Sequence, residues 1–305
     1  MGSFARLAAG NVEPIRSIYG TITKLTRVAH GVTYDPGRDE ILGSEPLASS
    51  IVAFKGGSNG QVAPVRVIQG PKTQLHQPWG LAVDDLHHEL VVGDYASSNI
   101  LVYPWDANGD VAPIRIIGGL KTRMRGISGV AVDPEHNLII AVTSQSRSPG
   151  AEAGVYGATF HTNVEPGGIF IFDRLANGDV APKAFIGGPD TGILGAKQVQ
   201  VWHDRIFTTV SNTPYTPPYD LAGYAPRKGC TGPPVPILTV GNPNDFVGVW
   251  KITDDGDVPP EFVIHGPNTG MASPTGIAID PQDGEIFITD GSVGGTFSFL
   301  VPQAF

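Results

Sequence analysis

Charge, long apolar runs and cysteine are all scarce in this chain of 305 residues. Charged residues make up 16% of it, whereas soluble domains average about 25%. The net charge is −9 and we find no basic patch, so we expect no nucleic-acid partner. No apolar stretch reaches the length of about 18 residues that a membrane-spanning helix needs. The sequence therefore predicts a soluble protein without a membrane span.

A single cysteine, Cys230, rules out an internal disulfide. A chain with one cysteine fits a cytoplasmic protein, and it also fits a secreted protein that needs no disulfide. Met1 to Phe4 shows no apolar signal segment. Nucleotide-binding glycine motifs and the GxSxG nucleophile motif are also missing. We therefore expect neither a nucleotide nor a flavin cofactor, and the compartment stays open.

Glycine and proline, in contrast, are abundant, with 40 and 27 residues. Such frequent turn formers favour many short strands, and they exclude a coiled coil or a helical bundle, which need long stretches of helix formers. No glycine recurs at every third position, which excludes collagen.

One phrase of about ten residues recurs five times, as in Gln61 to Gly70 (QVAPVRVIQG) and Asp110 to Gly119 (DVAPIRIIGG). Its prolines are spaced by 50, 49, 69 and 78 residues, which indicates a unit of about 49 residues with extra segments in two copies. The anchoring prolines are Pro14, Pro64, Pro113, Pro182 and Pro260.

Each unit predicts four strands, which we name a to d in chain order, with the proline phrase as strand d. In the second unit, strand a is Trp79 to Asp84, strand b is Leu90 to Asp94 and strand c is Ile100 to Tyr103. β-branched and aromatic residues fill these runs, and turn residues bound them. Four-stranded units of 40 to 50 residues are typical of β-propeller blades.

The chain begins with a d strand and ends with a, b and c strands. We therefore predict an all-β, five-bladed β-propeller over residues 1–305, closed by pairing of the N-terminal d strand with the C-terminal a, b and c strands. Two segments compete for strand c of the blade that this pairing completes: Phe4 to Leu7 and Phe297 to Val301.

Segments such as Gln77 to Asp84 (QPWGLAVD) and Ser273 to Asp280 (SPTGIAID) resemble NHL repeats. The resemblance covers essentially the whole chain. It implies membership of a propeller superfamily with gluconolactonase-like, strictosidine-synthase-like and paraoxonase-like members, which are usually six-bladed. The superfamily includes lactonases, lyases, cyclases and interaction platforms, so the resemblance is specific for fold and leaves function open.

Two long insertions, at 144–167 and 212–247, fall between strands b and c of the third and fourth units. They are expected on the same face as the connections from d to a, the face on which propellers usually bind ligands. We interpret them as lids over the channel mouth, with surface decoration or an oligomer contact as the alternative. Tyr156, His161 and Tyr219 are their candidate substrate contacts.

Strand b ends in an acidic residue in the units without insertions: Glu45, Asp94 and Asp290. Three carboxylates on one face could hold a divalent cation such as calcium, or could supply one catalytic acid or base. The alternative is that each carboxylate caps a turn. Gluconolactonase-like proteins bind a channel metal through carboxylate and asparagine ligands, and that resemblance implies Glu45, Asp290 and Asn212 as metal ligands here.

The residue that opens strand a is expected at the rim of the channel, and it differs from unit to unit. His30 occupies this position in the first unit, Trp79 in the second and Lys197 in the fourth. His30 and His76, which lies in a connection from d to a, are candidate proton-transfer residues. Trp79, Tyr95, Lys197 and Gln200 are candidate substrate contacts.

Two functions remain open from the sequence. The first is an enzyme, lactonase-like hydrolase or lyase/cyclase, acting on a small organic molecule with His30, His76, Glu45, Asp94 and Asp290 as catalytic groups. The second is a non-catalytic binding module for a sugar or a protein. Polar residues that differ from blade to blade favour the enzyme, because a lectin-like propeller would repeat one pocket. We expect a monomer.

Overall fold

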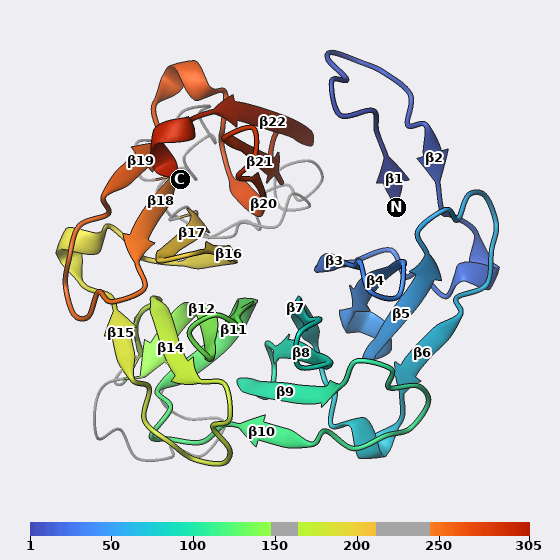
Figure 1. Ribbon diagram of the computed structural model, residues 1–305, viewed down its shortest axis with the longest axis horizontal. Helices are drawn as coiled ribbons and strands as arrows, with labels where there is room; N and C mark the ends of the chain where they lie inside the picture. The colour runs from blue at the N-terminus through green and yellow to red at the C-terminus, as the bar shows by residue number, and fades with distance from the viewer. Residues whose placement is uncertain (148–163, 212–244) are drawn as a thin grey trace, which may run out of the picture.

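The structure, a computed structural model, describes residues 1–147, 164–211 and 245–305. Five antiparallel sheets stand around a common centre, with strand a of each sheet innermost (Figure 1). The predicted five-bladed β-propeller is confirmed. Blade one consists of β3 (Val32–Asp35), β4 (Glu40–Glu45), β5 (Ser50–Lys55) and β6 (Arg66–Gln69). Blade two consists of β7 (Pro78–Asp84), β8 (Glu89–Asp94), β9 (Asn99–Pro104) and β10 (Arg115–Ile117).

The remaining blades keep this order of strands a to d, with additions and losses. Blade three consists of β11 (Met124–Asp133), β12 (Leu138–Arg147), β14 (Ile169–Asp173) and β15 (Ala184–Ile186), and β13 (Val164–Pro166) pairs with the far end of β12. Blade four consists of β16 (Ala196–Trp202), β17 (Arg205–Val210), β18 (Phe246–Lys251) and β19 (Phe262–Ile264). Blade five has three strands, β20 (Pro274–Asp280), β21 (Glu285–Asp290) and β22 (Gly295–Leu300).

The repeated proline phrase links each blade to the next through one backbone bridge. The isoleucine of strand d pairs with the glycine of the turn between c and d in the following blade, as Ile68 does with Gly109. That glycine has a φ of 77°, a left-handed conformation that other residues adopt only with strain. The same bridge recurs as Ile18–Gly60, Ile117–Gly178 and Ile186–Gly256.

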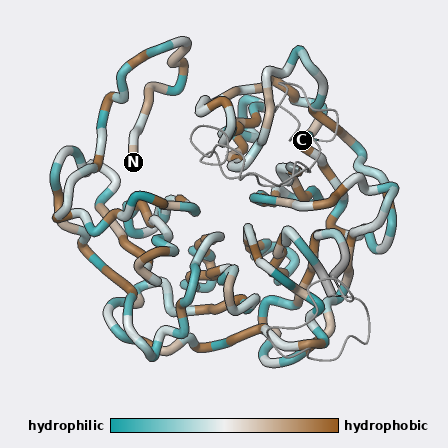
Figure 2. Tube along the Cα trace, turned by 180° about the vertical axis from the view of Figure 1, so that it is seen from behind, coloured by the Kyte–Doolittle hydropathy of each residue, from teal (hydrophilic) through white to brown (hydrophobic). Residues whose placement is uncertain are grey.

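The hydrophobic core is divided into layers between neighbouring blades. Leu42 and Ile51 of blade one pack against Leu90 and Tyr103 of blade two, and comparable clusters separate the later blades. Because both faces of an inner blade are buried, its strands are apolar on both sides. Figure 2 shows the same blades from behind, with the hydropathy of each residue along the trace.

The predicted closure of the ring is not what the structure has. β2 (Arg16–Ser17), the N-terminal strand d, pairs with β1 (Gly2–Ser3) and not with β22. The reason is that residues at the start of the chain satisfy its hydrogen bonds: the amide of Ile18 donates to Met1 O at 2.8 Å, and the amino terminus donates to Ile18 O at 2.9 Å. β22 takes the strand c position, so Phe297 to Val301 and not Phe4 to Leu7 supplies this strand. In both views the β1–β2 hairpin stands apart from β22 (Figures 1 and 2).

Part of the predicted insertions falls outside the described residues. Within 144–167, β12 runs on to Arg147 and β13 returns beside it. Tyr156 and His161 lie in 148–163, and Asn212 and Tyr219 lie in 212–244, so these four candidates are outside the described ranges. Within residues 1–147, 164–211 and 245–305, no helix is long and apolar enough to cross a membrane.

Candidate functional site at the channel rim

The three predicted carboxylates each join the end of strand b to the connection from d to a. Asp94 Oδ2 accepts hydrogen bonds from the amides of His76 and Gln77, both at 2.8 Å. Asp290 Oδ2 accepts the amides of Ala272 and Ser273, both at 2.7 Å. These bonds place strand ends and connections on one face of the ring, as predicted.

The other carboxylate oxygens are also largely occupied. Asp94 Oδ1 accepts the amide and the hydroxyl of Ser97 at 2.9 and 2.8 Å, and Asp290 Oδ1 accepts two amides of the following turn at 2.9 Å. Both side chains are buried. Carboxylate oxygens occupied by backbone donors in this way act as caps, so the geometry supports the capping alternative for Asp94 and Asp290.

Glu45 differs from the two aspartates because only one of its two carboxylate oxygens accepts hydrogen bonds among the described residues. Its Oε2 accepts the amide and the hydroxyl of Thr26 at 2.7 and 2.6 Å, while Oε1 is buried without a hydrogen-bond partner among the described residues. One free oxygen does not make a cation site, which needs several hard oxygen ligands. Across the described part of the chain, no three histidine, cysteine, aspartate or glutamate side chains form a metal-binding group. The third expected ligand, Asn212, lies outside the described residues, so the cation stays a prediction.

The rim of the channel is built from a β-bulge at the start of strand a. The pairing with strand b shifts register at Trp79 in blade two and at Ser128 in blade three, and it shifts across Lys197 in blade four. A bulge redirects one side chain out of the sheet pattern. Neighbouring strands a approach closely at this level: a Cβ at Gly80 would lie 2.7 Å from the amide nitrogen of Val130, which explains the glycine after the bulge.

Three aromatic rings are stacked at this rim. The ring centroids of His30 and Trp79 are 4.1 Å apart at 10°, and those of Trp79 and Tyr95 are 4.0 Å apart at 20°. Tyr95 in turn lies against Gly126, where a Cβ would be 3.0 Å from the ring. Both faces of Trp79 are therefore covered, and the stack ends in His30, which is exposed. The stack fixes the orientation of the His30 imidazole.

Two nitrogen bases of the rim are shifted towards their neutral forms. Although His30 as a residue is exposed, partial desolvation of its imidazole lowers its pKa below the ordinary value, because desolvation disfavours the charged imidazolium. Burial also lowers the pKa of Lys197, and the nearby carboxylate of Asp245 opposes that shift. Perturbed pKa values of this kind gather at functional sites.

Other predicted residues lie around this rim without joining the stack. His76 is exposed and its Nδ1 lies 2.9 Å from Gln74 O, and Gln200 is half-buried on β16, paired with Phe207. Sequence reasoning missed Gln198, whose amide donates to Ser128 O at 3.1 Å, and the buried Asp245. Asp245 precedes strand c inside a long insertion, and only its place next to an apolar run could have pointed to it.

The fold and the rim define a β-propeller with a ring-stacked histidine at the channel mouth. No protein-family model matches the chain, and no curated protein matches it. A solved chain of Kuenenia stuttgartiensis hydrazine synthase is similar with a TM-score of 0.49 and 12% sequence identity, over 87% of this chain and 56% of that chain. The chain thus spans a little over half of that protein, and the propeller assignment rests on its own sheets.

Proposed function

We propose that the protein is an enzyme that acts on a small organic molecule at the channel rim, with His30 as the proton-transfer residue. The observation that carries this proposal is the stack of Tyr95, Trp79 and His30, which presents one oriented imidazole at the channel mouth. A general base must be held within hydrogen-bonding reach of its substrate and be unprotonated at working pH. The lowered pKa of His30 supports the second condition, because it favours the neutral imidazole.

Lys197 supplies the electrostatic part of the proposed site. It occupies the same bulge position in blade four that Trp79 occupies in blade two. The charged ammonium form of Lys197, which the nearby carboxylate of Asp245 favours against burial, can stabilise negative charge that develops on a carbonyl oxygen or a leaving group. This chemistry suits ester or lactone hydrolysis and also elimination, which are the reaction classes we propose.

The test has one readout that needs no substrate. NMR titration of His30 should give a pKa below the ordinary value of about 6.5, and Trp79→Ala should raise that pKa by removing the surface that desolvates the ring. A His30 pKa at or above its ordinary value in the native chain would contradict the proposal.

The second readout is turnover on a panel of lactones and esters. His30→Ala should reduce kcat by about 100-fold or more, while His203→Ala should leave it unchanged, because His203 is exposed and pairs with Glu135 away from the rim. Equal activity of His30→Ala and the native chain would refute a catalytic His30. Ligand binding that His30→Ala weakens, without turnover, would identify a binding module instead.

A further inference from the structure

A cavity of about 630 Å³ lies between the N-terminal hairpin and blade one. Small-molecule sites in proteins typically enclose about 300 to 1,000 Å³, so this cavity has room for a ligand. The hairpin lines it with β1 and β2, and blade one lines it with β3 and the turns that follow β3 and β5. None of the three stacked rings of the channel rim is among the lining residues. The cavity is therefore a second candidate site, which the proposed function does not use.

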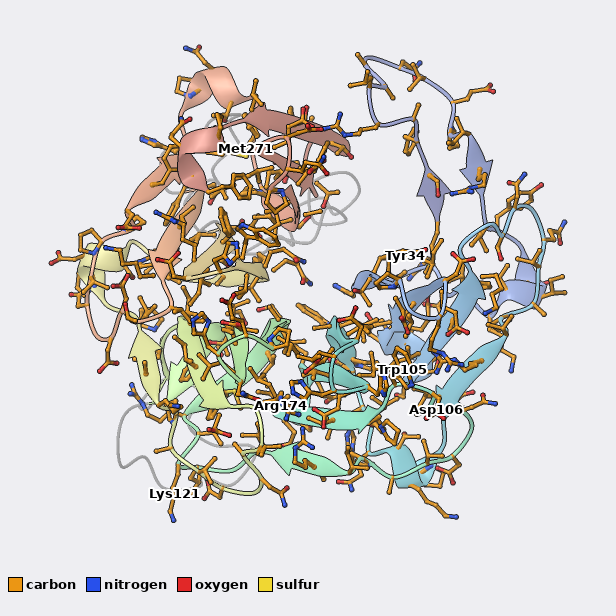
Figure 3. All side chains as sticks on the ribbon, viewed as in Figure 1. Tyr34, Trp105, Asp106, Lys121, Arg174 and Met271 are labelled. Carbon is orange, nitrogen blue, oxygen red and sulfur yellow. The ribbon has the colours of Figure 1, made fainter. Side chains whose placement is uncertain are left out.

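One part of the cavity wall is apolar and open to solvent. Val32 and Tyr34 of β3 are 59% and 52% exposed, whereas Leu81, which matches Val32 in blade two, is 7% exposed. Figure 3 shows Tyr34 on β3, beside the N-terminal hairpin. An apolar group of a ligand that covers this surface would remove it from water, which favours binding.

The hairpin side of the cavity carries a positive charge, the guanidinium of Arg16. Arg16 stands two residues before the isoleucine that bridges to the next blade, as Arg66 and Arg115 do. Arg66 donates to Glu40 at 2.9 Å. Arg115 donates to Glu89 at 2.8 Å. The exposed side chain of Arg16, in contrast, makes no hydrogen bond or ion pair within the described ranges, so it is available to an anionic group of a ligand.

The blade one side of the cavity carries the opposite charge, on Asp39. Tyr34 Oη donates to Asp39 Oδ1 at 2.9 Å, and the Gly56 amide donates to Asp39 O at 2.9 Å. A Cβ at Gly56 would collide with Asp39 Oδ1, which explains the glycine at this position. The carboxylate is thus held in place through one oxygen. Its other oxygen, Oδ2, accepts no hydrogen bond from the described residues and is available to a donor on a ligand.

We propose that this cavity binds a small zwitterion of the amino-acid or short-peptide class. The carboxylate of the ligand binds the guanidinium of Arg16, which can donate two parallel hydrogen bonds to it. The ammonium group of the ligand binds Asp39 Oδ2, and its apolar side chain covers Val32 and Tyr34. The two charges of the cavity come from different elements, β2 and the turn after β3. An anion without an ammonium group would be repelled by Asp39, so both charges of the ligand are needed.

Titration of the full chain with four probes, followed by protein NMR, tests the class of ligand. The probes are phenylalanine, the dipeptide leucyl-phenylalanine, N-acetylphenylalanine and phenylalanine amide. The first two carry both charges and should bind about tenfold more tightly or better than the last two, because each blocked probe lacks one charge-assisted hydrogen bond. The comparison of phenylalanine with the dipeptide distinguishes a single amino acid from a short peptide as the ligand.

Two variants test which side chain binds which group of the probe. Arg16→Gln should weaken phenylalanine and the dipeptide by about tenfold and leave phenylalanine amide unchanged, because the amide has no carboxylate. Asp39→Asn should weaken every probe that has a free amine and leave N-acetylphenylalanine no weaker than before. Lys183→Gln is the control, because Lys183 is an exposed cation of blade three that does not line the cavity. It should change no affinity.

Three results would overturn the proposal. The first is the absence of saturable binding of phenylalanine and of the dipeptide at millimolar concentration. The second is equal affinity for blocked and unblocked probes, or affinity that Arg16→Gln and Asp39→Asn leave unchanged. The third is a set of NMR shifts at His30 and not at Tyr34, which would assign the binding to the channel rim. Saturable binding that shifts Tyr34 and depends on Arg16 and Asp39 is the expected result.

Discussion

Blade one and blade five carry the same glutamate at the start of strand b, yet they hold it in different ways. Glu40 is buried against Arg66, with side-chain exposures of 2% and 8%. Glu285 lies in blade five, which lacks strand d, and it meets Arg6 from the loop of the N-terminal hairpin. The same residue in the same sheet position is buried in one blade and half-buried in the other. Neighbouring strands, not the repeat sequence, decide which of the two it becomes.

The largest expected effect is the difference in stability between variants of the two glutamates. Glu40→Ala should lower the free energy of unfolding by about 3 kcal/mol or more, because it leaves the buried guanidinium of Arg66 without its carboxylate. Glu285→Ala should lower it by less than about 1 kcal/mol, as exposed ion pairs do. Chemical denaturation of both variants measures the difference. Equal losses would mean that both carboxylates have the same surroundings in solution.

The pH dependence of the Glu40 effect provides the control. Burial alone would raise the pKa of Glu40, but hydrogen bonding and the charge of Arg66 outweigh burial and hold that pKa below its ordinary value. The carboxylate therefore stabilises the fold fully above the ordinary glutamate pKa of about 4.3, and this contribution is lost as pH falls through the lower folded pKa. The gap between the native chain and Glu40→Ala should shrink below about pH 4.

The next largest loss of stability is expected where an aspartate caps the end of strand b, compared with a blade that has a serine there. Asp94→Ala removes the acceptor of three amides and the Ser97 hydroxyl. It should destabilise the protein by about 2 kcal/mol, the range of a lost hydrogen bond to a charged group. Ser211→Ala in blade four, where the hydroxyl lies 3.1 Å from the hydroxyl of Ser273, should have a smaller effect. Thermal denaturation measures both variants, and a larger loss of stability in Ser211→Ala than in Asp94→Ala would contradict the capping role.

The smallest effect is expected at Thr143, which stands in blade three where blades one, two and five have the acid. Its hydroxyl is buried without a hydrogen-bond partner among the described residues. Thr143→Val keeps the shape and removes the unsatisfied group, so it should leave stability unchanged or raise it by up to about 1 kcal/mol. Thr209→Val, which removes a hydroxyl bound to Thr275 O at 3.4 Å, is the control and should not stabilise. Clear destabilisation by Thr143→Val would show that the hydroxyl has a partner in solution.

The sequence predicted the blades well because their determinants are local and repeated. The proline phrase, the glycine turns and the apolar runs recur at a nearly constant period, so each copy supports the interpretation of the others. The ring closure could not be predicted in the same way. It depends on a competition between β1 and β22 for β2, and Gly2–Ser3 has no strand signal of its own.

The sequence predicted which residues lie at the rim better than it predicted the contacts between them. His30, Trp79 and Lys197 were placed on the rim because each opens strand a. That Trp79 would be covered on both faces depends on the rotamers of His30 and Tyr95, which no periodicity encodes. For the carboxylates, the prediction of the interactions failed in another way. Their equivalent positions suggested that they act together, whereas each one accepts hydrogen bonds from backbone amides of its own blade.

An open ring has two terminal units, a property that a closed ring lacks. Each blade packs only against its neighbours, so this chain is energetically a short linear array of modules. Blade five, with three strands and one packed face, is the terminal module with the least to hold it. Fraying should begin there and advance blade by blade, and a denaturant gradient should resolve it as an early, partial transition.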